Sequence, residues 1–317
     1  MQATSEGLGP QLTFTIRDTP VVMPCFGIAL YTGEMLSKHG DAVLKAFERF
    51  GQWVPASELR WYITETMNKR KQVTAKTLNL LPTWLRPGAP RREYIALDLN
   101  GGKEWWESSD INFSVFGQEE DAPALSLGDA NWVRMSFPLG WMLDRLPELE
   151  AQALELFASM PFVSGSAGPM FELCPSYRME SQRFAWPTVM RYRGFDICDP
   201  EADCGGVRSD GLRSVGWLTF LGTRLADEFG GAAGLRLRLA KTVEIQELAT
   251  GLCLKAGSRP ALGDWGTGER LTDYESVFRA CEPAIERMAQ RYSPMDLGQD
   301  EKEKTRRLMR RYAYEDA

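Results

Sequence analysis

Segments with a strand-like, two-residue apolar period alternate along the whole chain with segments that have the apolar spacing of a helix. Residues 59–63, 95–99 and 133–137 each alternate apolar and polar side chains, which is typical of a strand with one buried face. Residues 43–54 and 277–288 instead repeat apolar side chains at helical spacing. Hydrophobic residues make up 44% of the chain, enough to build a sizeable core. The interleaving of the two patterns predicts an α+β fold.

The polar, acidic tract at residues 118–130 divides the chain, because a similar order of strands and helices restarts after it. We therefore predict two similar mixed modules, each a mainly antiparallel sheet with packed helices. The N-terminal module covers residues 1–125, and the C-terminal module covers residues 126–298. Residues 299–317 are rich in charge and predict a C-terminal helix or a solvated tail.

Chemistry that depends on histidine has little support, because His39 is the one histidine of the chain. Ser-His-Asp triads, Cys-His dyads and histidine-rich metal sites would all have to use that side chain. The six cysteines include no Cys-x-x-Cys pair. They predict buried, reduced thiols, with a Cys198–Cys204 disulfide as an open alternative. We expect no metal and no cofactor.

The net charge of −6 argues against direct binding of nucleic acid and suits a basic partner. No apolar run approaches the roughly 20 residues that a membrane helix needs. The segment MQATSEGLGPQ has neither a basic start nor an apolar core, so the sequence predicts no cleaved signal peptide. Together these features predict a cytoplasmic protein that binds no membrane.

Three carboxylates that lie close together in the sequence leave an enzyme open as an alternative. Asp264, Glu269 and Asp273 are residue types that can hold Mg²⁺ or carry out acid–base chemistry. Turn formation by Asp264 and helix capping by Asp273 explain the same residues without catalysis. No glycine-rich phosphate loop and no serine-nucleophile motif adds to the enzyme hypothesis.

Residues 103–121 combine two adjacent tryptophans with an excess of carboxylates over lysine. Trp105 and Trp106 cannot both point to one side of a strand, so one is exposed or the pair lies in a loop. An exposed ring beside carboxylates suits a basic protein partner, because the ring anchors and the charges steer. A solvated hairpin edge is the alternative interpretation. The candidate binding residues are Glu104, Trp105, Trp106, Glu107, Asp110, Glu119, Glu120 and Asp121.

A second candidate binding surface is the polar segment that contains Asp199, Glu201 and Asp203. It lies between two predicted core elements, and its polar composition predicts a loop. A loop in that position can vary without disturbing the scaffold, which is a common arrangement for binding residues.

The C-terminal half resembles a known family in the order and spacing of its motifs. These motifs are RYRGFDI at 191–197, SVGWLTFLGTRLADEFGG at 214–231 and LCLKAGSRPALGDWGTGERLTDYESVFRACEPAIERM at 252–288. They are similar to those of the TsiV-like family of type VI secretion immunity proteins. The matched positions are Trp217, Leu218, Thr219, Phe220, Leu221, Gly222, Gly230, Gly231, Gly257, Pro260, Gly263, Asp264 and Tyr274. Gly216 departs from the family pattern, which has Asn before the Trp.

The matched residues have the physical character of a scaffold. The structural set that we single out is Trp217, Phe220, Gly222, Gly231, Gly263 and Asp264. Its aromatic members lie in an apolar predicted strand, and its glycines bound a short helix and a turn. We therefore expect the binding surface to lie elsewhere in the chain.

The resemblance implies an immunity protein, or antitoxin, rather than an enzyme. Its partner would be a cognate secreted nuclease toxin of the VRR-Nuc or restriction-endonuclease-like class. Neutralisation would come from occlusion of the active site or of the DNA path of the nuclease. Two alternatives stay open, namely the carboxylate-based enzyme described above and an effector adaptor or chaperone that does not inhibit.

Overall fold

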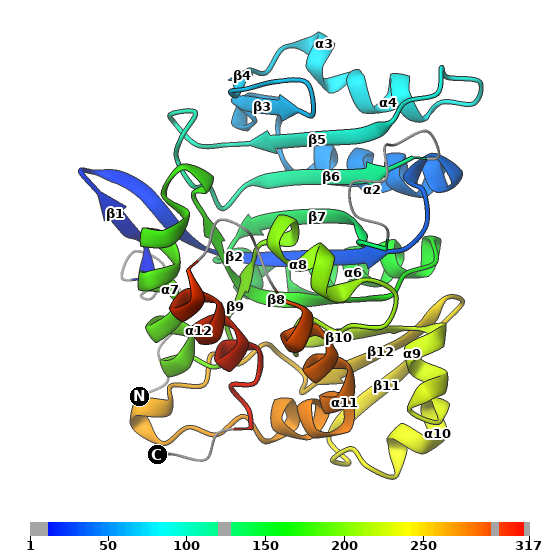
Figure 1. The fold of residues 1–317 in the computed structure, drawn as a ribbon, viewed down its shortest axis with the longest axis vertical. Coiled ribbons are helices and arrows are strands. Elements are labelled where there is room, and N and C mark those ends of the chain that lie inside the picture. The colour runs from blue at the N-terminus through cyan, green and yellow to red at the C-terminus, as the bar shows by residue number, and fades with distance from the viewer. Residues whose placement is uncertain (1–11, 120–127, 293–297, 314–317) are drawn as a thin grey trace.

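The computed structural model describes residues 12–119, 128–292 and 298–313, and these residues build one twelve-stranded sheet with packed helices (Figure 1). Ten of the described strands follow one path, in which every neighbouring pair is antiparallel. From edge to edge they are β11 (Val243–Leu248), β12 (Gly251–Ala256), β10 (Leu218–Gly222), β8 (Ser164–Leu173), β2 (Thr19–Thr32), β7 (Asn131–Pro138), β6 (Asn112–Gln118), β5 (Tyr94–Asn100), β3 (Trp61–Thr64) and β4 (Lys71–Gln72). Beside this path, β1 (Phe14–Ile16) pairs with β2, and β9 (Asp196–Cys198) pairs in parallel with β8.

The strand β2 occupies the centre of the sheet, and most of its residues are buried. Residues 25–32 pair with β7, and residues 22–31 pair with β8. Both edges of the strand are therefore paired. Its side chains are also buried on both faces of the sheet, which requires an almost continuous apolar run. Gly27 permits this packing, because a Cβ there would lie 2.5 Å from the sulfur of Met170.

The α+β class is confirmed, but one continuous sheet stands where the sequence predicts two. The strands of the two predicted modules are interleaved at its centre, since β2 from the first lies between β7 and β8 from the second. Backbone hydrogen bonds thus cross the predicted boundary along nearly the whole of β2. The division into two modules stays a prediction.

One face of the sheet carries α2 (Gly40–Trp53) and α6 (Leu146–Ser159). Their apolar sides bury aromatic rings against the strands, as the helical spacing of the sequence predicts. Phe50 of α2 packs on Phe137 of β7, with ring centroids 5.4 Å apart. Phe157 of α6 stacks on Phe220 of β10, with ring centroids 3.6 Å apart.

The other face is covered over only part of its width. The helices α7 (Arg178–Arg191) and α8 (Pro200–Val207) contact the central strands, and α11 (Thr272–Arg291) and α12 (Gln299–Met309) pack onto them. Figure 1 shows α8, α11 and α12 in front of the sheet, and it shows no described helix in front of β3, β5 and β6. This uncovered part is called the open half of the sheet below.

The remaining described elements are short. The α-helices are α3 (Ala75–Leu78), α4 (Leu80–Leu85), α5 (Trp141–Asp144), α9 (Thr223–Glu228) and α10 (Gly231–Arg236). The 3₁₀ turns are η2 (Leu36–His39), η3 (Ala56–Glu58), η4 (Pro175–Tyr177) and η5 (Trp265–Thr267). The helix α11 runs through Pro283 as one element. None of the described helices is long and apolar enough to cross a membrane.

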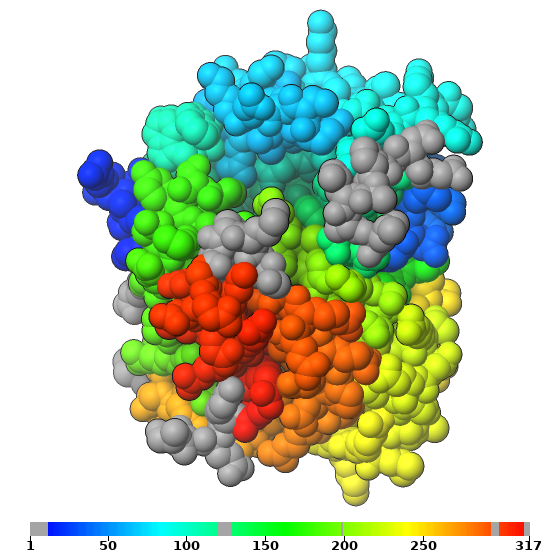
Figure 2. All heavy atoms as spheres, viewed as in Figure 1, coloured from blue at the N-terminus to red at the C-terminus, as the bar shows by residue number. Residues whose placement is uncertain are grey.

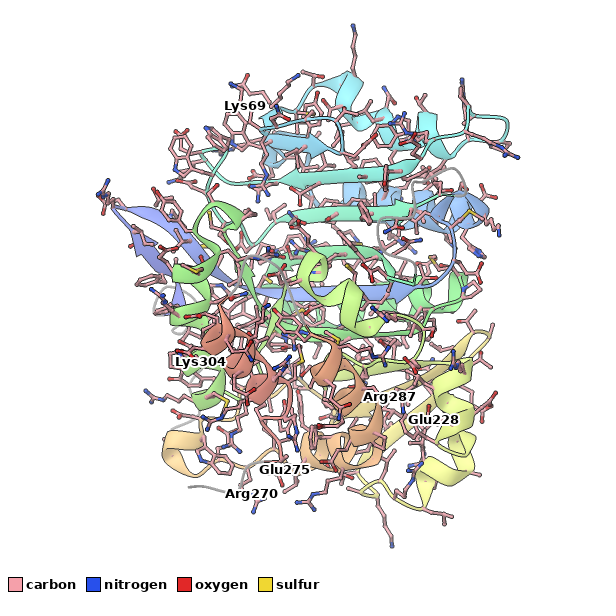
Figure 3. All side chains as sticks on the ribbon, viewed as in Figure 1. Lys69, Glu228, Arg270, Glu275, Arg287 and Lys304 are labelled. Carbon is pink, nitrogen blue, oxygen red and sulfur yellow. The ribbon has the colours of Figure 1, made fainter. Side chains whose placement is uncertain are left out.

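The charged C-terminal segment is a docked helix and not a solvated tail. Lys304 of α12 lies 5.5 Å from the ring of Trp186 in α7, and both helices are visible in Figure 3. Just beyond α12, the side chain of Arg311 is fully buried. Its guanidinium donates to Ser214 Oγ at 2.6 Å and to the carbonyl oxygens of Arg193 and Val215 at 2.9 and 3.2 Å.

Arg311 belongs to a buried group of charges that holds α8 and the C-terminal segment to the core. Arg213 donates to Asp203 at 2.9 Å and lies 3.4 Å from Asp196, which is also 3.7 Å from Arg311. Tyr31 of the central strand donates to the second carboxylate oxygen of Asp203 at 3.2 Å. Burial raises the pKa of Asp203 to about 7, and the nearby Arg213 opposes that rise. Each charge is thus buried together with its partner, which is the condition for keeping charges in a core.

Replacing Trp217 by Ala should lower the free energy of unfolding by about 3–5 kcal/mol through the cavity that it leaves. The indole is fully buried, packs edge-to-face on Phe26, and donates to the carbonyl oxygen of Gly257 at 3.0 Å. Chemical denaturation of the variant measures the loss. An unchanged denaturation midpoint would contradict a structural role.

Replacing Arg311 by Met should cost about 3–5 kcal/mol, because buried acceptors and Asp196 lose a cationic partner. The matched control is Arg307→Met, at an exposed position of the same segment, which should shift stability by no more than about 0.5 kcal/mol. Denaturation curves of the two variants give the comparison. Equal midpoints would show that the C-terminal segment does not depend on this buried guanidinium.

A polar cleft over the open half of the sheet

A cleft of about 360 Å³ lies where the open half of the sheet meets the beginnings of α7 and α8. In Figure 2 the cyan residues of the β3–β5 region stand above the green residues of α7 on this face. Most of the residues that line the cleft are polar or charged, although the cleft rests on strands whose opposite face is apolar. Its floor residues are Asp98, Asn112, Ser114, Trp132, Arg134 and Glu172, and its rim includes Lys69, Trp105 and Glu201.

The strand register explains why these polar side chains meet. Ser114 of β6 pairs with Asp98 of β5 on one side and with Arg134 of β7 on the other. Residues that face each other across a ladder point to the same side of a sheet, and so do alternate residues along a strand. The polar members of three strands are therefore all presented to one face, while Phe113 and Met135 beside them point to the core.

Ion pairs cross the cleft and connect elements that are distant in sequence. Arg70 pairs with Asp98 at 3.0 Å, and Arg134 pairs with Glu172 at 2.6 Å. Arg178 of α7 pairs with Asp199 at 2.6 Å. Burial raises the pKa of Glu172, and the charge of Arg134 opposes the rise. The four basic and four acidic residues of the lining balance, so the cleft is polar without a net charge.

Two buried acceptors in the floor, Asn112 Oδ1 and Glu172 Oε1, have no hydrogen-bond partner within the described residues. Asn112 is almost fully buried, and its amide nitrogen donates to Asp98 Oδ2 at 3.1 Å. Its carbonyl oxygen Oδ1 accepts no hydrogen bond in the part of the chain that the structure describes. A buried acceptor without a donor costs about 1–3 kcal/mol, and a water or a partner group that supplies a donor recovers that cost.

The predicted tryptophan pair lies in the β5–β6 loop, at the rim of the cleft. Trp105 is 38% exposed, and the two indole rings are nearly perpendicular with centroids 5.2 Å apart. Trp106 is less exposed, and its carbonyl oxygen accepts from the thiol of Cys174 at 2.6 Å. The expectation of a loop with one exposed ring is confirmed.

The acidic residues predicted beside the tryptophans do not form one surface. Glu104 is exposed, whereas Asp110 is half-buried, and burial raises the pKa of its carboxyl group. Glu107 is buried, and its carboxylate accepts from the backbone N–H groups of Lys103 at 2.6 Å and Glu104 at 3.1 Å. Glu107 therefore shapes the loop from inside it.

The remaining predicted acids lie away from the cleft or outside the described residues. Glu119 follows the opposite end of β6, where it accepts hydrogen bonds from the hydroxyl and the backbone N–H of Ser37. Seven strand residues separate it from the loop of Trp105, a length of about 20 Å or more. Glu120 and Asp121 fall outside the residues that the structure describes.

The second predicted surface reaches the same cleft. Its residues begin helix α8 and do not form a loop, because Asp199 caps the helix through the N–H of Ala202. Glu201 is largely exposed and lines the cleft, while Asp203 belongs to the buried charge group. The two surfaces that the sequence suggested separately, at Trp105 and at Glu201, therefore meet at one site. The alternating polar residues of β5, β6 and β7 were the signal that could have revealed it.

The three carboxylates of the enzyme hypothesis each serve a different structural contact. Asp264 pairs with Arg191 through two contacts of 3.0 Å, which lowers the pKa of the carboxyl group. Glu269 accepts from the backbone N–H of Asp264, and Asp273 accepts from the hydroxyl of Thr242. Among the described residues, no group of three or more histidine, cysteine or acidic side chains is arranged to hold a metal.

The structural set from the sequence lies outside the open half of the sheet and serves packing or backbone conformation. A Cβ at Gly222 would lie 1.9 Å from the carbonyl oxygen of Phe162. Gly231 and Gly263 both have φ at +64°, in the left-handed region that favours glycine. Phe220 is fully buried against α6. None of these residues lines the cleft.

Comparison with known proteins matches nearly the whole chain. The model of the TsiV family, described as type VI immunity for VRR-NUC, matches residues 42–312. A solved structure, the Pseudomonas aeruginosa T6SS protein PA0821, superposes with a TM-score of 0.77 at 18% sequence identity. The superposition covers 97% of this chain and 90% of that protein, and at this identity it shows a shared fold. No curated protein sequence matches the chain.

Replacing Glu107 by Ala should lower the free energy of unfolding by about 1–3 kcal/mol, because two backbone N–H groups lose a buried charged acceptor. Glu104→Ala is the matched control in the same loop and should change stability by less than about 0.5 kcal/mol. Thermal and chemical denaturation measure both variants. If the Glu107 variant is as stable as the control, Glu107 has no structural role and is again a candidate binding residue.

Proposed function

The chain belongs to the TsiV family of type VI immunity proteins for VRR-NUC, and on this ground we propose that it neutralises a cognate VRR-NUC nuclease by occlusion. The family match over residues 42–312 carries the proposal. Membership of an immunity family makes the chain an inhibitor and not an enzyme. Inhibition then requires no reaction, because a bound protein that covers the active site or the DNA path is sufficient.

We place the nuclease contact at the cleft and its rim. Trp105 supplies a partly exposed ring of the kind that anchors protein interfaces. Glu104, which precedes Trp105 in the loop, and Glu201, which lines the same cleft as Trp105, are exposed acids. A nuclease that binds DNA presents basic groups to such acids.

The partner and the compartment follow from the same proposal. The cognate nuclease is the binding partner, with no direct contact between this chain and nucleic acid. The net charge of −6 disfavours contact with DNA and favours the basic face of a nuclease. Neutralisation of a nuclease that attacks DNA has to take place in the cytoplasm, where the DNA lies.

The decisive experiment is co-expression of this chain with the nuclease, followed by survival and DNA-cleavage assays with the purified pair. Stoichiometric loss of cleavage together with complex formation supports the proposal. Binding without loss of cleavage would replace it with an adaptor function. A failure to bind at all would contradict an immunity role toward that nuclease.

Trp105→Ala should weaken binding to the nuclease by about 2 kcal/mol, close to thirtyfold in Kd, if the ring anchors the complex. The control is Leu237→Ala on the surface outside the cleft, where an 89% exposed apolar side chain is removed. Titration calorimetry on both variants, after their melting curves are matched to the wild type, measures the difference. Equal affinities would remove Trp105 from the interface.

A further inference from the structure

The N-terminal hairpin stands out from the body of the molecule. It consists of β1, a two-residue turn at Arg17 and Asp18, and the first residues of β2. The strand β1 pairs with β2 and with no other described strand. Figures 1 and 2 show the hairpin in dark blue, projecting beyond the neighbouring helix α7. Both residues of the turn are exposed, so the tip of the hairpin is open to a partner.

The base of the hairpin is fixed, although its tip is not. The carbonyl oxygen of Val21 accepts from the backbone N–H of Cys174 and from the hydroxyl of Ser181, both at 2.9 Å. The ring of Phe14 stacks on the ring of Phe184 in α7, with centroids 4.3 Å apart. These contacts hold the ribbon in one direction before any partner arrives. A preorganised segment loses less entropy on binding than a mobile one.

The hairpin is joined to the rim of the cleft. The carbonyl oxygen of Pro20 accepts from the backbone N–H of Ser108 at 2.9 Å. Ser108 lines the cleft and belongs to the same loop as Trp105. Cys174, which holds the base of the hairpin, lines the cleft as well. A partner that covers the cleft is therefore within reach of the hairpin.

The turn has a backbone conformation that does not suit the residues in it. Ile16 pairs with Thr19, so two residues make the turn, and φ is +50° at Arg17 and +64° at Asp18. Positive φ at both positions is typical of a type I′ turn, in which Asn-Gly is strongly preferred. A side chain with a Cβ is disfavoured in this left-handed region.

The strain at the turn is uncommon within this chain. Among the described residues, Arg208 is the one other non-glycine residue with positive φ. Stability alone would favour Asn and Gly at the tip of the hairpin, and two charged residues stand there instead. Backbone strain of this kind is concentrated at functional sites, where the side chain has a task that the fold does not require.

We propose that the hairpin enters the DNA-binding channel of the nuclease and places Arg17 and Asp18 at its active site. The inference rests on the proposed function and names the segment that produces the occlusion. The two strands of a hairpin lie about 4.8 Å apart, so the ribbon is narrow. A channel that admits DNA can admit such a ribbon, whereas the body of the molecule stays outside and covers the mouth.

The two turn residues match the charges that the active site of a nuclease contains. A nuclease that uses metal ions holds them with carboxylates, and it binds the phosphates of DNA with lysine and arginine. The carboxylate of Asp18 can take the position of a phosphate among those cations. The guanidinium of Arg17 can pair with the metal-binding carboxylates. Both contacts block the substrate and need no reaction.

The test replaces the tip of the hairpin with the residues that its turn favours. Arg17→Asn together with Asp18→Gly relieves the backbone and removes both charges. The control, Lys241→Asn together with Glu244→Gln, removes one positive and one negative charge at exposed positions outside the hairpin and the cleft. Both double variants keep the net charge of the full chain. Melting curves and surface plasmon resonance with the cognate nuclease compare them with the wild type.

The hairpin variant should melt at or above the temperature of the wild type and still bind the nuclease at least about tenfold more weakly. The control should bind like the wild type. A hairpin with only a structural role predicts the opposite, namely unchanged or tighter binding by the variant with the relieved turn.

The single variant Asp18→Asn separates the charge from the shape of the turn. Asparagine tolerates positive φ, so this variant keeps the hairpin and loses only the carboxylate. It should bind at least about fivefold more weakly than the wild type at low salt, with a smaller difference at high salt. Wild-type binding by Asp18→Asn, together with weak binding by the double variant, would overturn the role of Asp18 and keep the hairpin in the interface.

A labelled DNA duplex tests where the tip lies on the nuclease. On a cleavage-inactive variant of the nuclease, the wild-type chain should displace the duplex completely, as measured by fluorescence anisotropy. The double hairpin variant at saturating concentration should leave part of the duplex bound. Binding of the wild type without displacement, or equal displacement by the double variant, would overturn entry of the hairpin into the channel.

The inference and the proposed function fail in different ways. If both hairpin variants bind as tightly as the control while the wild type inhibits, the inference is overturned and the proposed function stands. If the wild type does not bind the nuclease at all, the proposed function itself is overturned.

Discussion

The pairing of β2 with β7 on one side and β8 on the other is the constraint on which the rest of the molecule depends. Ten register positions join β2 to β8, and eight join it to β7. A strand whose two edges and two faces are enclosed must be apolar along most of its length, and this one is. Its N-terminal position in the chain means that the later strands have to be added on both sides of it. The folding of the C-terminal strands β10, β12 and β11 therefore relies on a strand from the beginning of the chain.

The buried charge group attaches helix α8 and the C-terminal segment to that sheet. Tyr31 of β2 reaches Asp203 of α8, and Arg213 and Arg311 bring the following segment and the C-terminal segment to the same place. Charges in a core are costly unless each finds its partner, so the group is satisfied only when all of these segments are docked together. This requirement favours one arrangement of the helices on the covered face over looser alternatives. It also explains why the highly charged end of the chain is held in place by a buried arginine.

Local pattern in the sequence predicted local structure well, and it failed where structure depends on distant pairing. The alternating runs at 59–63, 95–99 and 133–137 correspond to the strands β3, β5 and β7. These runs do not predict that β2 lies between β7 and β8, because strand order is set by contacts between residues far apart in the sequence. Arg311 was missed for a similar reason, since its carbonyl partners are more than 90 residues away.

The candidate site shows the same limit. An exposed Trp105 in a loop was predictable from two adjacent tryptophans, and Glu201 was predictable as a polar surface residue, but their meeting at one cleft was not. The interior role of Glu107 was also hidden, because a carboxylate that accepts from backbone N–H groups looks in the sequence like any solvated acid. Acidic residues close in sequence were read as one surface, whereas β6 carries Glu119 away to the other end of the sheet.

The molecule thus separates the residues that maintain the fold from those available to a partner. Trp217, Phe220 and Gly222 lie in the covered half, where a change of one side chain disturbs packing on every side. The cleft lies over β5 and β6, where one face of the sheet has no described helix over it. An immunity protein has to fit one particular nuclease, and this arrangement lets the recognition surface differ between relatives while β2 and the covered half keep the same fold.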